Sequence, residues 1–174
     1  MDWYSAGWHY YEQTRPNDDR LSSLPAEWQR ELVALTLLDQ QMNNGAYLQF
    51  LANCGRTAYV YSRQALHKIG ARRMVEIVDT CQGLVDEHFP TEGRPQHERG
   101  RLLLNQVLDR EGHTIKEAGS VLPEAVVARV YELSYEYMSY PDKVSELAQS
   151  HYGPLIGELA AKAAGKKPWW RFWA

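Results

Sequence analysis

Six histidines and two cysteines are the side chains that could bind a metal ion or act as a base or nucleophile. They are His9, His67, His88, His97, His113, His151, Cys54 and Cys81. No two histidines have the His-x-x-x-His spacing that places both on one helix face, and neither H-E-x-x-H nor C-x-x-C occurs. The segment DEHFPTEGRPQHE gathers histidines and glutamates, but its prolines and glycine are typical of a polar loop. The sequence therefore predicts no metal site and no cofactor.

Recognisable catalytic motifs are also missing from the sequence. There is no G-x-S-x-G elbow, phosphate-binding loop or dinucleotide fingerprint. The cysteines have no accompanying base motif that would mark a nucleophile, and we expect buried thiols. We therefore expect no catalytic residue and no enzyme, with a small-molecule enzyme of unknown reaction as an alternative.

The cellular setting follows from two further absences in the sequence. The N-terminus MDWYSAGWHYYEQ lacks the apolar region of a secretory signal. No window approaches the ~18 uninterrupted apolar residues that a membrane span requires. We expect a cytoplasmic protein without a membrane span.

The elements that would position a site are helical along the whole chain. Apolar residues recur at spacings of three and four in successive segments, and alternation with a period of two is nowhere sustained. The segments include SSLPAEWQRELVALTLLDQQM, TAYVYSRQALHKI, ARRMVEIVDTCQGLVDEH, HERGRLLLNQVLDR, residues 123–140, and DKVSELAQSHY and LIGELAAKAA, which Gly153-Pro154 separates. The apolar stripe of ARRMVEIVDTCQGLVDEH is Met74, Ile77, Val78, Cys81 and Val85. Residues 123–140 carry Val127, Val130, Tyr131, Ser134 and Met138 at helical spacing. We predict an all-α, compact single domain of seven to eight short helices over residues 1–174. It comprises an aromatic-rich N-terminal segment (1–22), a helical core (23–164) and an aromatic and basic tail (165–174).

The stretch MNNGAYLQFLANCG interrupts this helical pattern. Asn43, Asn44 and Gly45 lie between two segments of helical period, so they predict a joint between helices. One asparagine can leave the first helix in the left-handed conformation, and Asn44 can cap the next helix. Gly55 and Gly70 are expected to end the two helices that follow.

Gln49 and Asn53 remain as polar side chains in the segment after this joint. They are four residues apart and therefore lie on one side of a helix. We expect them to satisfy backbone groups of neighbouring helices, because buried polar groups are usually hydrogen-bonded. A recognition site made of the same groups is the alternative.

The same stretch carries a resemblance to a known family. LVALTLLDQQMNNGAYLQFLANCG and QALHKIGARRMVEIV resemble the DNA-mimic protein family, an all-α bacterial domain of unknown function, best over residues 27–90. Ala46 departs from the second glycine that is more usual in its motif. The matching positions are Asn44, Gly45, Tyr47, Gln49, Phe50, Asn53, Gly55, Ala65, Leu66, Ile69, Gly70 and Ala71. The resemblance implies a helical fold and a carboxylate array that imitates DNA phosphates and occupies a DNA-binding protein.

Six acids are candidates for such an acidic face: Glu76, Asp79, Asp86, Glu87, Glu132 and Glu136. Duplex DNA carries about one charge per 1.7 Å of its axis. One acid per helical turn gives only about one per 5.4 Å, so several acidic helices would have to align. The first four acids lie opposite an apolar stripe, where solvated residues belong without any partner. Arg72 and Arg73 share that polar side and dilute its field.

Charge is distributed in alternating blocks along the chain, whose formal net charge is −3. Residues 41–75 hold five bases and no acid, whereas the blocks on either side of them are acidic. An alternating pattern indicates neither a nucleic-acid-binding face nor general repulsion of nucleic acid. We expect no direct binding of nucleic acid.

The tail GKKPWWRFWA combines large aromatic side chains with positive charge. Its candidate partner-binding residues are Trp169, Trp170, Arg171, Phe172 and Trp173. The tail can dock on its own domain, against the aromatic N-terminal segment. It can instead anchor a protein partner or a second copy in a homodimer, because Trp and Arg are favoured at interface hot spots. A foothold at a membrane interface is the third interpretation.

Together these features predict a cytoplasmic module that binds a protein partner of unknown identity and inhibits or regulates it. A DNA mimic with an acidic surface and a toxin-neutralising immunity protein are the alternatives among binding proteins. A coherent acidic face would favour the mimic, because a field of one sign steers association. A concave pocket lined with histidines or carboxylates would favour the enzyme instead.

Overall fold

The computed structural model describes residues 1–14, 20–104, 106–108, 114–116 and 121–165 of the 174-residue chain. The described part contains six α-helices, a short 3₁₀ helix and two short strands. The helices are α1 (Trp3–Glu12), α2 (Glu27–Ile69), α3 (Arg72–Asp86), α4 (Gln96–Leu103), α5 (Glu124–Met138) and α6 (Val144–Gly165). The 3₁₀ helix is η1 (Arg20–Ser23), and the strands are β1 (Gln106–Leu108) and β2 (Thr114–Lys116).

The long helix α2 is broken twice, at places where the sequence predicts helix boundaries. The first break lies at Gly45 (φ −170°, ψ 25°) and Ala46 (φ 67°, ψ −174°), directly after the two asparagines. The second lies at Gly55, whose φ of 73° and ψ of −174° are not helical. Gly70 ends the helix in the left-handed conformation (φ 79°, ψ 17°). The predicted joints are therefore present, but Ala46, and not an asparagine, adopts the positive φ of the first joint.

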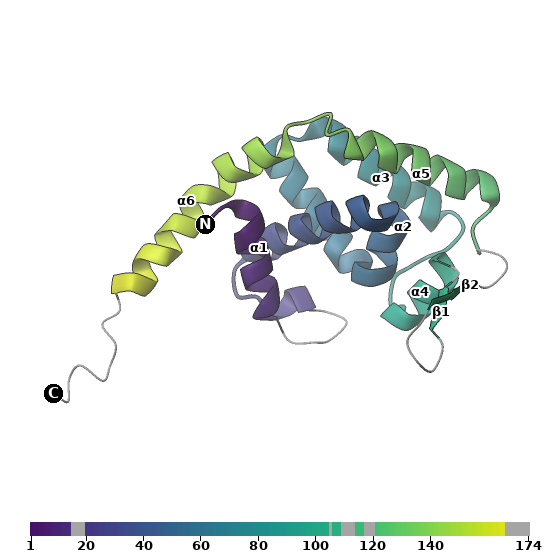
Figure 1. The fold of residues 1–174 in the computed structure, drawn as a ribbon, viewed down its shortest axis with the longest axis horizontal. Coiled ribbons are helices and arrows are strands. Elements are labelled where there is room, and N and C mark those ends of the chain that lie inside the picture. Colours follow the sequence, from purple (N-terminus) through teal and green to yellow (C-terminus); the bar gives the residue numbers. More distant parts are fainter. Residues whose placement is uncertain (15–19, 105, 109–113, 117–120, 166–174) are drawn as a thin grey trace.

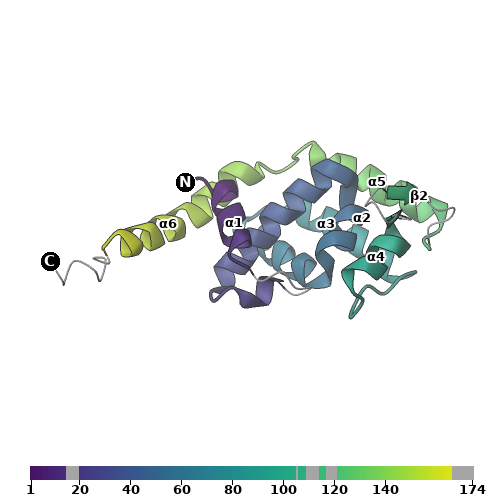
Figure 2. The same ribbon diagram turned by 60° about the horizontal axis from the view of Figure 1, so that its bottom comes forward.

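The three segments of α2 form the centre around which the other helices pack (Figures 1 and 2). α1 crosses the first segment, α3 and α5 lie along one side, and α4 covers the opposite end. α6 contacts α1 and α2 and then extends beyond the rest of the described molecule. The predicted apolar stripe of α3 is confirmed, since all its members are buried: Met74, Ile77, Val78, Cys81 and Val85.

The helical class is confirmed, but the number of helices differs from the predicted seven or eight. α2 contains three of the predicted helices, and α6 contains two because it continues through Pro154. The helix predicted from residue 97 to 110 ends at Leu103. β1 follows it and pairs antiparallel with β2, with Val107 opposite Ile115. β-branched residues favour such pairing, and strands of three residues are too short to show a period in the sequence.

A buried ion pair connects the two ends of α2 with α6. The side chain of Glu31 is 0% exposed, and its Oε1 lies 2.5 Å from Nζ of Lys68. Its other oxygen accepts a hydrogen bond of 3.4 Å from the hydroxyl of Tyr152. A buried carboxylate is tolerated only when it is paired and hydrogen-bonded, so these contacts fix how the three helical segments pack.

Candidate functional site

The residues of the predicted joint lie close together, around the side chain of Gln41. The amide groups of Gln49 and Asn53 donate to Oε1 of Gln41 at 3.0 and 2.8 Å. An added Cβ at Gly45 would lie 1.8 Å from Oε1 of Gln49, so only glycine leaves room for this amide. The joint is thus held by contacts between side chains across the break, and not by the backbone contacts that the sequence suggested.

The two asparagines of the joint have different surroundings. The amide of Asn43 donates to the backbone oxygen of Asp39 and to the hydroxyl of Tyr140, both at 2.8 Å. That hydroxyl donates in turn to Oδ1 of Asp39 at 3.0 Å. Burial raises the pKa of Asp39, and the hydrogen bond from Tyr140 opposes this rise. Asn44 is exposed, and it does not form the predicted cap at this break within the described structure.

The acids of the predicted acidic face are largely neutralised by arginines. In α3, Asp86 lies 2.6 Å from the guanidinium of Arg56, and Asp79 lies 2.7 Å from that of Arg63. Both hydrogen bonds raise the pKa of the arginine concerned. Both arginines come from the last segment of α2, which the sequence showed to be a basic block.

The remaining acids of this face follow the same pattern, with one exception. Arg73 bridges α3 and α5, because its guanidinium lies 2.7 Å from Glu76 and 2.6 Å from Glu136. In α5, Glu132 lies 2.9 Å from Arg129. Glu87 is exposed and has no such arginine contact in the described structure. The six carboxylates therefore form a mixed network of acids and arginines, and not a field of one sign.

An exposed apolar and aromatic surface runs along α5. Its aromatic and apolar members, which we call the α5 face, are Ala125, Ala128, Tyr131 and Tyr135, and the exposed acids Glu124 and Glu132 lie in the same arc of the helix. Tyr135 is 66% exposed and Tyr131 is 38% exposed. The opposite side of the helix is buried against α2 and α3, so the α5 face is held in place. It presents large aromatic groups on a rigid support.

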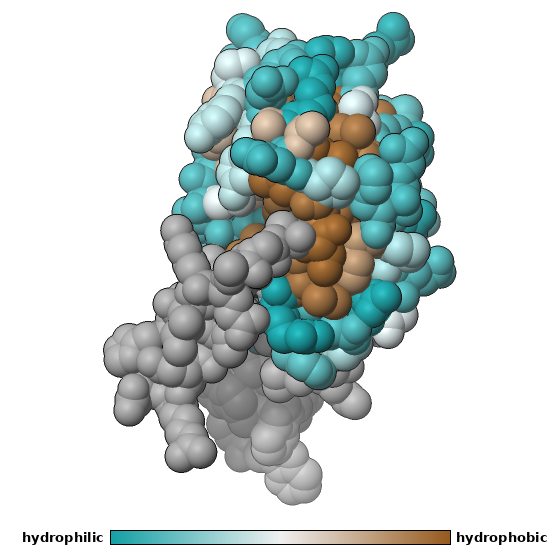
Figure 3. Space-filling model, turned by 90° about the vertical axis from the view of Figure 1, so that its right-hand side faces the viewer, coloured by the Kyte–Doolittle hydropathy of each residue, from teal (hydrophilic) through white to brown (hydrophobic). Residues whose placement is uncertain are grey.

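An apolar patch is exposed at the end of the molecule where α4 and the start of α5 lie (Figure 3). Val121, just before α5, is 43% exposed. Its N–H donates to the backbone oxygen of Leu102 in α4 at 3.5 Å, which connects the two helices there. Exposed apolar patches with a polar edge are typical of interaction surfaces.

The sequence pattern did not identify this surface. It placed Tyr131 with Val127, Val130, Ser134 and Met138 on the apolar stripe of the helix. In the structure Val130 and Ser134 are buried as this stripe predicts, and Val127 and Met138 are half-buried, but Tyr131 is exposed. Leu133 and Tyr137 are buried in addition. The spacing of Tyr131 and Tyr135 on one helix was the available signal, but it could not show which tyrosines point outward.

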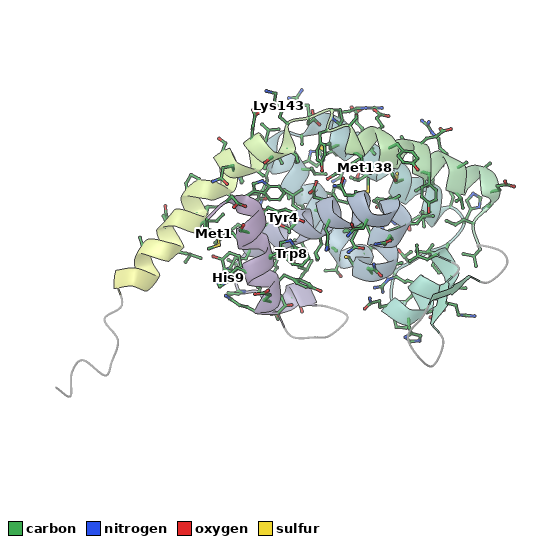
Figure 4. The ribbon with its side chains drawn as sticks, in the orientation of Figure 1. Met1, Tyr4, Trp8, His9, Met138 and Lys143 are labelled. Atoms are coloured by element: carbon green, nitrogen blue, oxygen red, sulfur yellow. The ribbon has the colours of Figure 1, made fainter. Side chains whose placement is uncertain are left out.

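The N-terminal aromatic segment forms α1 and packs on the core. Trp3 and Tyr10 are buried, and the ring of Tyr10 lies edge-on to that of Trp28 in α2, with 5.6 Å between their centroids. Tyr4 and Trp8 lie on the side of α1 that faces α2, and His9 lies on the other side (Figure 4). The residues of the predicted partner-binding tail lie outside the described residues: Trp169, Trp170, Arg171, Phe172 and Trp173.

The described residues show no grouped set of metal ligands. Within residues 1–14, 20–104, 106–108, 114–116 and 121–165, no three histidine, cysteine, aspartate or glutamate side chains gather where they could hold an ion. Cys81 is buried, and burial raises its pKa to about 12, whereas Cys54 is half-buried. Across the same described residues, no helix is both long enough and apolar enough to cross a bilayer.

Comparison with known proteins matches the chain to one family model. The model describes DMP19-like proteins and covers residues 22–151, from η1 into α6. Searches of curated proteins and of solved structures gave no significant match. The matched range includes both joints of α2, the network of acids and arginines and the α5 face. The chain therefore belongs to the DMP19-like family, which confirms the resemblance to DNA-mimic proteins found in its sequence.

Proposed function

We propose that this chain is a cytoplasmic, non-enzymatic module that binds a protein partner through the α5 face and thereby inhibits or regulates it. The observation that carries the proposal is the outward position of Tyr131 and Tyr135 on a helix whose other side is buried. Tyrosine is enriched at interface hot spots because it offers a large contact area with few rotatable bonds.

The surroundings of the α5 face also suit a protein interface. Ala125 and Ala128 leave room beside the tyrosines for a partner to approach the helix closely. The ion pair between Arg129 and Glu132 adds polar groups beside the two alanines of the face. Interfaces commonly combine an aromatic centre with a polar rim that excludes water from the centre.

Membership of the DMP19-like family favours a second candidate, a DNA mimic that occupies a DNA-binding protein. Phosphate imitation requires carboxylates whose charge remains available to the partner. Five of the six candidate acids instead have an arginine within 2.9 Å. A mimic built on this network would have to separate its own ion pairs on binding, so the α5 face is the better candidate for the main contact.

Affinity capture from a lysate of the source cell tests both candidates, with three variants beside the wild type. Tyr131→Ser with Tyr135→Ser removes the aromatic groups, and Glu76→Gln with Glu87→Gln removes two carboxylates at α3, outside the α5 face. Val60→Ser is the matched control, because Val60 is an exposed apolar residue of α2 (41% exposed) outside the α5 face. Thermal unfolding of each variant shows that the fold is retained.

We expect a protein that the wild type and the Val60 control retain and that the tyrosine variant releases. Loss of two hot-spot side chains should weaken binding by at least about 30-fold. Release by the glutamine variant alone would favour the DNA mimic. Equal capture by all four proteins, or capture by none, would contradict binding through the α5 face. A captured second copy of the chain would identify the predicted homodimer.

A further inference from the structure

A pocket of ≈ 540 Å³ lies where the start of α1, the first segment of α2 and the start of α6 meet. Its size is that of a small-molecule site. The carboxylates of Asp2 and Asp39 and the aromatic side chains of Trp3, Tyr4 and Tyr140 line it. Its described lining includes no lysine, arginine or histidine, and none of it belongs to the α5 face. The pocket is therefore acidic, aromatic and separate from that surface.

Asp39 is the carboxylate in this pocket that lacks an opposite charge. It is half-buried, and its Oδ1 accepts the hydrogen bond of 3.0 Å from the hydroxyl of Tyr140. Its Oδ2 has no hydrogen-bond partner in the described part of the chain. This oxygen is nevertheless open to solvent, because the enclosed side-chain atoms without a partner are those of Gln64, Thr91 and Tyr137. A cation in the pocket could therefore reach it and offset the burial that raises the pKa of Asp39.

The first joint of α2 fixes the direction of this carboxylate. The amide of Asn43 donates to the hydroxyl of Tyr140 at 2.8 Å, so the single proton of that hydroxyl is directed to Oδ1 of Asp39. Tyr140 has a φ of 51°, in the left-handed region that side chains other than glycine seldom adopt. The hydrogen bonds to Asn43 and Asp39 thus hold the tyrosine in place and leave Oδ2 as the acceptor for a ligand.

Asp2 adds a second negative charge to the pocket. Its carboxylate caps α1 by accepting hydrogen bonds from the N–H and the hydroxyl of Ser5, at 2.8 and 2.9 Å. These bonds, above all the one from the N–H, lower the pKa of Asp2, so it stays ionised at neutral pH. The bases nearest in sequence are the Met1 amino group and Lys143, but neither lines the pocket, and Lys143 pairs with Glu146 at 3.4 Å. The described walls therefore do not neutralise these acids.

The aromatic side chains are an independent indication that the ligand is an organic cation. Tyr4 is half-buried and Tyr140 is 41% exposed, so both rings can touch a ligand. The ring of Trp3 lies edge-on to that of Tyr4, with 5.5 Å between their centroids. Trp3 is fixed to α6, because its indole N–H donates to Ser145 at 3.2 Å and its backbone N–H donates to Gln149 at 2.8 Å. Ring faces attract organic cations, and these contacts hold the rings ready.

We propose that this pocket binds a small organic amine in its protonated, ammonium form. The ammonium group donates to Oδ2 of Asp39, and the alkyl part lies against the rings of Tyr4 and Tyr140. A bare metal ion fits less well, because no three ligand side chains gather within the described structure. An anion would be repelled by both carboxylates. The site would make the module sensitive to an amine, independently of the α5 face.

NMR titration of the full chain with n-butylammonium chloride tests the proposal, at pH 7 and constant ionic strength. The indole N–H signal of Trp3 reports binding in the pocket. In parallel titrations, 1-butanol has a similar shape without the charge, and tetramethylammonium has the charge without N–H donors. Asp39→Asn removes the charge but keeps an oxygen that can accept from Tyr140. Glu146→Gln is the matched control, because it removes an acid of α6 that does not line the pocket.

We expect n-butylammonium to shift the Trp3 indole signal to saturation. Its affinity should fall by at least about tenfold in Asp39→Asn and change little in Glu146→Gln. The wild type should bind 1-butanol at least about tenfold more weakly, a result that does not depend on any variant. Absence of a saturable shift, equal binding of 1-butanol, or equal affinities of wild type and Asp39→Asn would overturn the proposal. Tetramethylammonium binding as tight as n-butylammonium binding would overturn the assignment of a ligand that donates to Asp39.

Discussion

Removal of the Lys68 ammonium should destabilise this protein far more than removal of an ordinary surface lysine. Glu31 is fully buried, and its Oε1 lies 2.5 Å from Nζ of Lys68. The Lys68→Met variant keeps a side chain of similar length but leaves the Glu31 carboxylate with only the Tyr152 hydroxyl, at 3.4 Å. A buried carboxylate that loses its cation destabilises the fold, because no opposite charge then offsets the free energy needed to remove the carboxylate from water.

The structure sets the size of the effect. Two unit charges 2.5 Å apart attract by roughly 6–7 kcal/mol at an effective dielectric constant of about 20. Desolvation of Glu31 offsets much of this attraction, and loss of one partner of a buried pair typically costs about 3–5 kcal/mol. The Lys68 side chain is 44% exposed, so water already screens part of the attraction. We therefore expect a loss of about 3 kcal/mol in the free energy of unfolding, measured by urea denaturation.

Two further variants make the measurement specific. Lys143→Met is the matched control, because Lys143 pairs with Glu146 at 3.4 Å while both side chains are more than 70% exposed. Such exposed pairs contribute at most about 1 kcal/mol. Adding Glu31→Gln to Lys68→Met removes the buried charge and should restore at least about half of the loss. A loss of stability in Lys68→Met no larger than that in Lys143→Met would show that the pair of Glu31 and Lys68 does not stabilise the fold.

Three other changes test further parts of the fold. Gly45→Ala places a methyl group against the Gln49 amide, so urea denaturation should show a loss of about 1–3 kcal/mol in the free energy of unfolding. Gly83→Ala is the control in an open part of α3 and should raise the free energy of unfolding by about 0.5–1 kcal/mol. Equal effects of the two variants would contradict the packing at the joint. Burial raises the pKa of Asp39, so the folded chain holds this proton more tightly than the unfolded chain, and stability should fall as pH rises through the raised pKa. Asp39→Asn should abolish that part of the pH profile, and an unchanged profile would count against this burial. Burial raises the pKa of Cys81 to about 12, so at pH 8 the folded chain holds this residue as an unreactive thiol. Peptide mass spectrometry should therefore show labelling of Cys81 by a thiol reagent only after unfolding. Rapid labelling of the native chain would contradict the burial of this thiol.

Structural features that depend on residues close together in the sequence were predictable from it. The apolar stripe of α3 follows from spacings of three and four residues, because those positions share one helix face. The break at Gly55 follows from the conformational freedom of glycine. The Asn-Asn-Gly sequence indicated the place of the other break, but Gly45 and Ala46, and not the asparagines, have the non-helical backbone there. Helix α6 shows the limit of such signals, because it continues through Pro154, where the sequence predicts a boundary between two helices.

Features that depend on contacts distant in sequence were not predictable in this way. The pairing of Asp86 with Arg56, and of Glu136 with Arg73, joins residues from different helices. A helical wheel shows that the acids of α3 are solvated, but it does not show which basic residues a neighbouring helix brings beside them. The outward position of Tyr135 likewise depends on how α5 rotates against α2 and α3, which the tyrosine-rich pattern of this segment leaves undetermined.

Site-specific photo-crosslinking in the source cell is the most direct test of binding through the α5 face. A photoreactive phenylalanine derivative replaces Tyr135, which is 66% exposed, or, as the control, Val60, which is 41% exposed on α2. Binding through the α5 face predicts a discrete crosslinked protein at position 135 that is absent or much weaker at position 60. A chain that forms no adduct at position 135, or that forms the same adduct equally at both positions, would contradict the proposal that the α5 face binds the partner.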